Sequence, residues 1–280
     1  FSRFETISSL LLCAVYMLRT RDLISGTVLY LPARSILKPL FEKAALSGIE
    51  PTVLPRIEFG DWIPIESSVL VVVSSLLPSG GGIDAAVQKL KDLYHVSQKG
   101  EVRFCLLCDP KESDFPSTPQ EEYATRVLCD KIDLLNRTLA DKFYLVVRPR
   151  SFIKTQGKFA GKERKRGAIG ALVRIISGQS TDGLTAFCGN ITNLHSVKYL
   201  LVLDSDTALQ LDSVQKFVGA AAHLLNRKYG VFSPSLGIKL SSAGSTPFTK
   251  LMCETGGTVA YDNNCSEYYQ DIFDDSIFSG

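Results

Sequence analysis

Short runs of consecutive apolar residues alternate with amphipathic segments along most of the chain. Four of the runs have the Val-rich, continuous character of strands that are covered on both faces: 67–78, 101–110, 143–149 and 198–204. The segments that follow them carry apolar residues at helical spacing: 85–96, 121–142, 165–177 and 212–225. This order predicts an α/β fold with a mostly parallel, Rossmann-like sheet and helices on both faces. "YGVFSPSL", at 229–236, predicts a fifth strand.

The first 60 residues have a different pattern. Apolar helical stretches at 8–18 and 33–46 are followed by "GIEPTVLPRIEFGDWIP", whose prolines favour an extended connection. We therefore predict a helical or interfacial segment with its linker at 1–60 and an α/β domain at 61–280. The stretch at 8–18 is shorter than the roughly 20 residues that span a bilayer. An interfacial helix, the tail of a membrane helix and a helix on the domain surface all stay open for it.

Composition narrows the class of protein. Of the 280 residues, 45% are apolar and 21% charged, which is typical of a packed globular protein. The net charge of +2 does not favour nucleic-acid binding through global charge, so any basic site is local. Among the seven cysteines, Cys105 and Cys108 lie three apart in a predicted strand, so they face opposite sides and make a poor zinc pair. We expect the cysteines to be reduced, buried thiols.

Two carboxylates lie one residue apart at the end of the fourth predicted strand, in "LVLDSDT". Asp204 and Asp206 repel each other unless a cation or water separates them. Mg2+ or Mn2+ is commonly held by one or two carboxylates together with substrate phosphates. The alternative is helix capping, but Asp212 with Gln215 three residues later predicts a capping box for the next helix. Asp204 and Asp206 therefore become candidate ligands of a metal–diphosphate group.

Other polar residues follow the predicted strands at the same edge of the sheet. Ser74 and Ser75 end the first strand, and Asp109 ends the second. Ligands of open α/β sheets bind beyond the carboxyl ends of the strands. A P-loop is excluded, because "PSGGGID" at 78–84 lacks the lysine that this motif requires.

A basic run, "KTQGKFAGKERKRGAIG", covers 154–170 and precedes a predicted helix. Cations and a helix N-terminus both favour phosphate, so Arg164, Lys165 and Arg166 are candidate phosphate ligands. A solvated loop is the alternative; nucleic acid is disfavoured because Phe159 alone offers a stacking ring within the run. The acidic, aromatic segment "SEYYQDIFDDSIFSG", at 266–280, suits sugar binding and a solvated loop equally.

Four motifs in order resemble a known family. They are "RIEFGDWIPIESSVLVVVSSLLPS", "ERKRGAI", "LVLDSDT" and "YQDIFDDSIFSG". Together they are similar to the glycosyltransferase domain of cyclic beta-1,2-glucan synthases, in family 84 of the glycosyltransferases. The order and spacing agree from about Leu54 to Gly280.

The resemblance implies a GT-A fold, a UDP-glucose donor, Mg2+ or Mn2+, and inverting transfer of glucose to a growing beta-1,2-glucan. It also implies a larger membrane protein, with this domain on the cytoplasmic face of the inner membrane. Carried over, Asp204 and Asp206 hold the metal and diphosphate, and Asp109 contacts uracil or ribose. Asp271 contacts the acceptor or donor sugar, and we expect the general base beyond Gly280, so that this chain alone is incomplete for transfer. The remaining residues on the donor side are Ser74, Ser75, Arg164, Lys165 and Arg166.

Two other functions stay open from the sequence. A GT-A-like domain could serve assembly or regulation in a membrane glucan-synthesis protein without catalysis. A metal-dependent nucleotidyltransferase would use a similar sheet, but it would need a basic residue beside the glycines of 78–84.

Overall fold

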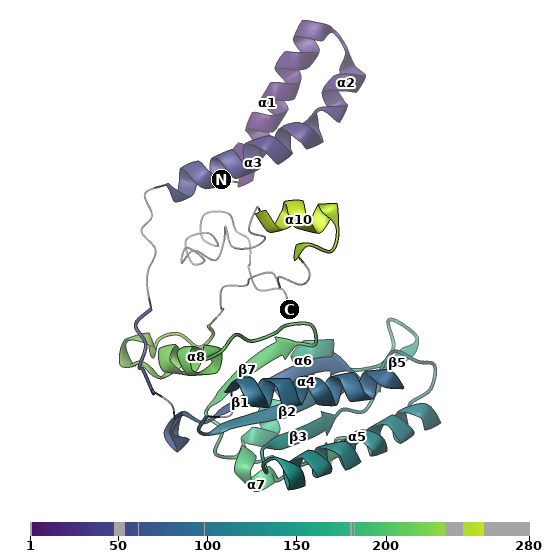
Figure 1. Cartoon of the computed structure of the whole chain (residues 1–280). Coiled ribbons are helices and arrows are strands. Elements are labelled where there is room, and N and C mark those ends of the chain that lie inside the picture. The colour runs from purple at the N-terminus through teal and green to yellow at the C-terminus, as the bar shows by residue number, and fades with distance from the viewer. Residues whose placement is uncertain are drawn as a thin grey trace. The chain divides into compact units, whose positions relative to one another are not determined.

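The structure is a computed structural model, and it describes residues 2–47, 54–60, 62–97, 99–179, 181, 183–232 and 243–254. The chain forms two compact units. The helical unit comprises Phe1–Leu54 and Ser233–Ser279, and the sheet unit comprises Pro55–Phe232 with Gly280 (Figure 1). The functional division into 1–60 and 61–280 stays a prediction.

The helical unit contains α1 (Ser2–Thr20), α2 (Leu23–Val28), α3 (Tyr30–Leu46) and α10 (Pro247–Glu254). Asp22 caps α2, because its carboxylate accepts hydrogen bonds from the backbone N–H groups of Ile24 and Ser25. α1 packs against α3, and Arg34 of α3 pairs with the buried Glu5 of α1 at 2.9 Å. Within the described part of the chain, we find no helix with the length and apolar character needed to cross a membrane.

The sheet unit confirms the predicted fold class. Each of the four apolar runs forms a strand, and these strands pair in parallel: β1 (Val69–Leu76), β2 (Val102–Asp109), β3 (Phe143–Val147) and β7 (Tyr199–Asp204). A short strand, β6 (Ala186–Cys188), adds antiparallel to β3, so the order is β6-β3-β2-β1-β7 (Figure 1). The predicted fifth strand is wrong for 229–232, which form no strand, and its remaining residues lie outside the described ranges.

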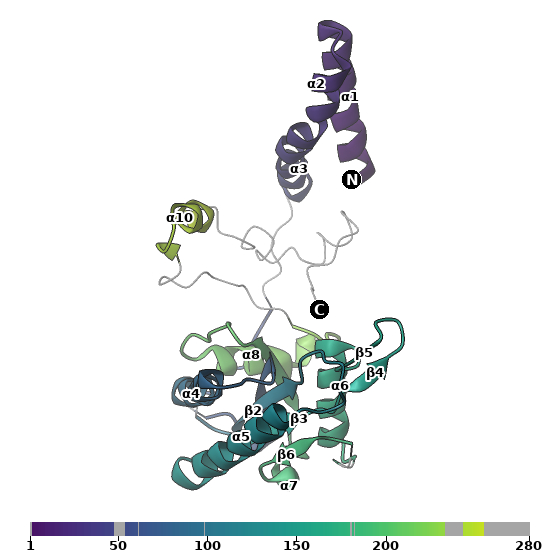
Figure 2. The same cartoon turned by 90° about the vertical axis from the view of Figure 1, so that its right-hand side faces the viewer.

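Helices cover both faces of the sheet. One face carries α4 (Gly81–Ser97), α5 (Pro119–Thr138) and α8 (Ser213–Ala222), and the other carries α6 (Arg164–Ile176) and α7 (Ile191–Leu194) (Figure 2). Successive strand residues alternate between two buried clusters, as the pleat requires: Phe104 packs toward α4 and α5, and Cys105 packs toward α6. Burial on both faces explains the continuous apolar runs. Short 3-10 turns at Ile65–Ser67 and Leu224–Asn226, and a hairpin of β4 (Ser151–Ile153) and β5 (Lys158–Ala160), complete the unit.

The strand order reverses at β1. From β1 the chain proceeds to β2 and β3 on one side and returns with β7 on the other side. Ligands of open α/β sheets bind in the crevice beyond such a reversal. Ser74 of β1 is in register with Asp204 of β7, and Leu76 is in register with Asp109 of β2. The fold therefore places the predicted Ser74, Asp109 and Asp204 along one edge.

The cysteines are partly as expected. Cys105 and Cys108 face opposite sides of β2 as buried free thiols, and burial raises the pKa of Cys108 to about 12. The expectation of reduced thiols is wrong for Cys129 of α5 and Cys188 of β6, which form a disulfide. β6 pairs with β3, against which α5 packs, so the two sulfurs meet although 59 residues separate them.

Candidate functional site

A buried ion pair joins the ends of β2 and β3. Arg148 donates from Nε to Oδ1 and from Nη2 to Oδ2 of Asp109, each at 2.6 Å. The two side chains are only 9% and 12% exposed, respectively. This bidentate arrangement fixes the plane of the guanidinium. Because Arg148 binds both carboxylate oxygens of Asp109, the geometry favours a positioning role for Asp109. The predicted contact of Asp109 with a nucleoside stays a prediction.

Arg148 also holds the loop that leads into α6. Its Nη1 donates to the carbonyl oxygen of Lys162 at 3.1 Å, and its Nη2 donates to that of Arg164 at 2.9 Å. Glu163 and Arg164 have left-handed backbones, with φ of 59° and 44°. Such conformations are uncommon for residues with a side chain and persist where surrounding contacts enforce them, often at ligand-binding loops. The buried pair provides that enforcement here.

Two glycines allow the loop to approach the buried pair. A Cβ added at Gly161 would lie 2.7 Å from Oδ2 of Asp109. A Cβ added at Gly167 would lie 2.1 Å from the Lys162 carbonyl oxygen and 2.8 Å from Nη1 of Arg148. Any side chain at either position would push the loop away from Arg148. The glycines at the two ends of "GKERKRG" are therefore required by the pair beneath them.

Substitution of these glycines tests this packing. We expect Gly167→Ala to lower the free energy of unfolding by about 1–3 kcal/mol, because the methyl group overpacks the loop. Gly170→Ala, in the same helix, is the control: the nearest atom would be the end of the Arg174 side chain at 3.8 Å. This second change should stabilise the protein by about 0.4–1 kcal/mol through the lower entropy of the unfolded chain. Urea unfolding measures both, and equal effects would contradict the proposed loop packing.

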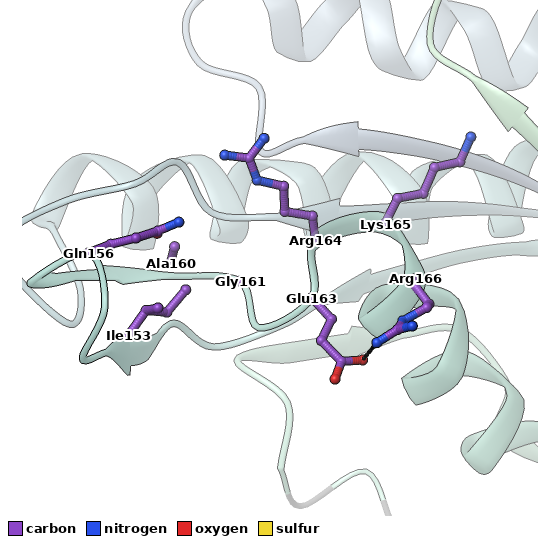
Figure 3. A pocket seen from close by; sticks show the side chains of 8 residues that line it. All are labelled: Ile153, Gln156, Ala160, Gly161, Glu163, Arg164, Lys165 and Arg166. Carbon is purple, nitrogen blue, oxygen red and sulfur yellow. Dashed lines mark ion pairs between the residues drawn. The ribbon is translucent and has the colours of Figure 1, made fainter. Parts of the chain in front are cut away.

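The loop forms one wall of a pocket of about 540 Å³ (Figure 3). The lining residues are Ile153, Gln156, Ala160, Gly161, Glu163, Arg164, Lys165 and Arg166. Arg166 turns toward Glu163, with Nη2 3.3 Å from Oε2, whereas Arg164 and Lys165 extend on the other side of the backbone. The first turn of α6 contains no acidic residue. The N-terminus of a helix carries a partial positive charge, which repels the basic side chains beside it. An anion bound there would therefore be stabilised by the helix dipole and by these side chains together.

Lys165 connects this basic loop to the edge of the sheet. Its Nζ lies 2.6 Å from Oδ1 of Asp204, the last residue of β7. The side chains are 37% and 62% exposed, so solvent and ligands reach both. The structure thus brings together two features that the sequence predicted separately, namely the basic run and the first aspartate of "DSD".

The remaining predicted residues have mixed outcomes. Asp206 follows Asp204 in the turn after β7, and Ser75 lies with its Oγ 3.7 Å from the Cys108 sulfur. The predicted capping box is wrong: Asp212 is the N-cap of α8, but its φ of 59° is left-handed and its side chain makes no cap hydrogen bond. An N-cap carboxylate reaches the next turn from an extended backbone. Asp271 lies outside the described residues.

The aspartates provide oxygen ligands but not a complete metal cage. Among the residues that the structure describes, no group of three or more His, Cys, Asp or Glu side chains gathers in a way that could hold a metal ion. Mg2+ typically takes only one or two protein carboxylates and completes its coordination with phosphates and water. Asp204 and Asp206, exposed beside a basic loop, fit that type of site.

Comparison with known proteins places the chain in context. No protein-family model matches it. The chain is 29% identical over 268 residues to the cyclic beta-(1,2)-glucan synthase NdvB of Rhizobium meliloti (strain 1021). The match covers 89% of this chain and 9% of that protein, so the chain spans less than a tenth of the length of its relative. The resemblance to cyclic beta-1,2-glucan synthases is thereby confirmed along nearly the whole chain.

Proposed function

We propose that the sheet unit is the donor-binding part of a glycosyltransferase that transfers glucose from UDP-glucose to a growing beta-1,2-glucan. The observation that carries the proposal is the meeting of Lys165 and Asp204 at the point where the strand order reverses. One side of this point offers cations and a helix N-terminus, and the other offers carboxylates. A nucleoside diphosphate with a divalent cation has the complementary charges. Similarity to a glucan synthase supports glucose as the sugar.

The proposed reaction is a single displacement with inversion at the donor carbon. An acceptor hydroxyl oxygen bonds to C1 of glucose, the bond from C1 to the diphosphate oxygen breaks, and the hydroxyl proton passes to a carboxylate base. Negative charge builds on the departing diphosphate, where Arg164, Lys165 and the dipole of α6 stabilise it. A Mg2+ or Mn2+ ion held by Asp204 and Asp206 would supply Lewis-acid stabilisation of the same group. Asp271 is a candidate for sugar contact.

In this proposal Asp109 and Arg148 shape the site by fixing the loop that leads into α6. Their pair fixes the left-handed turn from which α6 begins, and that turn directs Arg164 and Lys165 away from Arg166 (Figure 3). Ser74, in register with Asp204, lies at the same edge of the sheet. These residues fix the spacing of the donor-binding groups. That spacing determines how well the charges of the site match those of the bound diphosphate and cation.

Donor selection tests the proposed substrate. We expect unlabelled UDP-glucose to displace bound radiolabelled UDP-glucose from this chain at least tenfold more effectively than ADP-glucose, in the presence of Mn2+. The expectation follows from the UDP-glucose donor that the resemblance to glucan synthases implies. UDP-galactose serves as a control for recognition of the sugar. Stronger displacement by ADP-glucose would contradict the proposed donor.

We also propose that the helical unit attaches to a membrane surface. Between α1 and α3 the buried residues are small or polar, such as Ser9, Cys13, Ala33 and the paired Glu5. The outer surface carries many large apolar side chains of both helices: Phe4, Ile7, Leu10, Leu11, Leu12, Val15, Leu18, Leu31, Ile36 and Leu40. Small and polar residues inside with apolar residues outside is the arrangement of helices that pack in lipid, opposite to that of proteins in water.

Binding to vesicles tests this attachment. We expect the chain to sediment with vesicles that contain phosphatidylglycerol. Leu11→Lys should weaken that binding about tenfold, because it removes one apolar side chain that would insert into the bilayer. Tyr123→Lys is the control, because Tyr123 is a comparably exposed apolar residue (67% against 60%) on α5 of the sheet unit. Equal losses from both variants would contradict attachment through α1.

A further inference from the structure

Lys165 connects the basic loop with the carboxylate at the end of β7. It lines the basic pocket together with Arg164, and its Nζ contacts Oδ1 of Asp204 at 2.6 Å. The same Asp204 oxygen is a candidate metal ligand under the proposed function. A lysine ammonium and a divalent cation cannot both occupy that position, because like charges repel at such a distance.

We infer that Lys165 changes partners when donor binds: it neutralises Asp204 in the ligand-free chain and transfers its Nζ to the diphosphate when a divalent cation takes its place on Asp204. This inference rests on the proposed function. The lysine acts as an internal substitute for the metal, which limits the repulsion between Asp204 and Asp206 before ligand arrives. No covalent bond changes, since one ion pair is exchanged for two others.

The ion pairs of the site differ in a way that suits this exchange. The Arg148–Asp109 pair is about nine-tenths buried and bidentate, so it is costly to break. The Lys165–Asp204 pair joins one nitrogen to one carboxylate oxygen, and the two side chains are 37% and 62% exposed. Exposed ion pairs contribute little stability, and lysine has a long flexible stem that can be redirected by bond rotation. The fixed pair holds the backbone of the loop, and the exposed pair is free to rearrange.

The exchange predicts effects of opposite sign from one substitution. Lys165→Met should tighten the binding of Mn2+ alone by about two- to fivefold, because an exposed competing ion pair is removed. The same variant should weaken the binding of UDP at saturating Mn2+ by about ten- to a hundredfold, because a charge-assisted contact to the diphosphate is lost. Lys165→Arg, which retains the charge, should restore UDP binding to within about threefold of the original chain.

Mn2+ binding is measured from the electron paramagnetic resonance signal of the free ion, and UDP binding by calorimetry, both on the whole chain. Lys162→Met, which removes an exposed charge from the same loop, is the control and should not tighten Mn2+ binding. Circular dichroism establishes that each variant is folded, and Lys165→Gln, which also removes the charge, provides the second variant if Lys165→Met does not fold. An unchanged or weaker Mn2+ affinity in Lys165→Met overturns the exchange, as does an unchanged or tighter UDP affinity. If the original chain does not bind UDP at all, the proposed function fails, and the Mn2+ measurement still decides separately whether Lys165 competes for Asp204.

Discussion

Arg148→Met is expected to lower the free energy of unfolding of the sheet unit by about 3–5 kcal/mol. The substitution leaves the Asp109 carboxylate, which is only 12% exposed, without its counter-ion. Breaking a buried pair by removing one partner costs about this much, because an uncompensated charge stays buried. It also removes the donors to the Lys162 and Arg164 carbonyl oxygens, so α6 loses the contacts that fix its first turn. Urea unfolding followed by circular dichroism measures the change.

Two further variants distinguish the loss of the buried ion pair from the loss of any positive charge on the loop. Arg166→Met removes an arginine whose side chain is 75% exposed, and it should change stability by no more than about 0.5 kcal/mol. Combining Asp109→Leu with Arg148→Met should recover part of the loss, because no buried charge is then left unpaired. If Arg148→Met and Arg166→Met were equally mild, Arg148 would not be the residue that holds the loop.

Asp204→Asn is expected to weaken the binding of UDP with Mn2+ by about 10- to 100-fold without loss of the fold. A neutral amide is a poorer ligand for a divalent cation than a carboxylate, and contacts with charged groups contribute about 1.5–3 kcal/mol. The Asp204 side chain is 62% exposed, so stability should change by no more than about 0.5 kcal/mol. Asp206→Asn should behave in the same way.

Asp212→Asn is the matched control for the aspartate variants. It lies on the same segment, at the N-cap of α8, and makes no side-chain cap hydrogen bond. We expect it to change neither UDP affinity nor stability. A large fall in the melting temperature of Asp204→Asn or Asp206→Asn would instead identify a structural acid rather than a metal ligand.

The sheet and its helices could be predicted because burial on both faces leaves a direct pattern in the sequence. β1 and β7 each contain at least five consecutive apolar residues, and the helices between the strands have one apolar face. The parallel pairing of the main strands followed from the alternation of strands and helices along the chain. The very short strands were not found: β4, β5 and β6 have three residues each, too few for a pattern with period two to emerge.

The candidate site was only partly visible in the sequence. The aspartates and the basic run could be found, because they follow a buried strand and precede a helix. Arg148 was overlooked because a single arginine after a strand usually lies in solvent, and its partner Asp109 is 39 residues earlier. The adjacency of β2 and β3 offered the available signal, since it brings the two strand ends together. The disulfide of Cys129 and Cys188 was missed because its formation depends on where β6 pairs, and spacing does not reveal that.

The capping box failed for a local reason. Asp212 and Gln215 have the required spacing, but the motif also needs an extended backbone at the N-cap. The left-handed backbone at Asp212 directs its side chain elsewhere, and Gln215 is buried instead, only 8% exposed. Spacing alone cannot distinguish these backbone conformations.

The metal dependence of UDP binding tests the central claim most directly. The original chain is titrated with UDP by calorimetry, first with saturating Mn2+ and then with EDTA. If a divalent cation on Asp204 and Asp206 offsets the charge of the diphosphate, UDP should bind with Mn2+, and its affinity should fall at least tenfold with EDTA. Equal affinity under the two conditions would contradict a metal–diphosphate site at the end of β7.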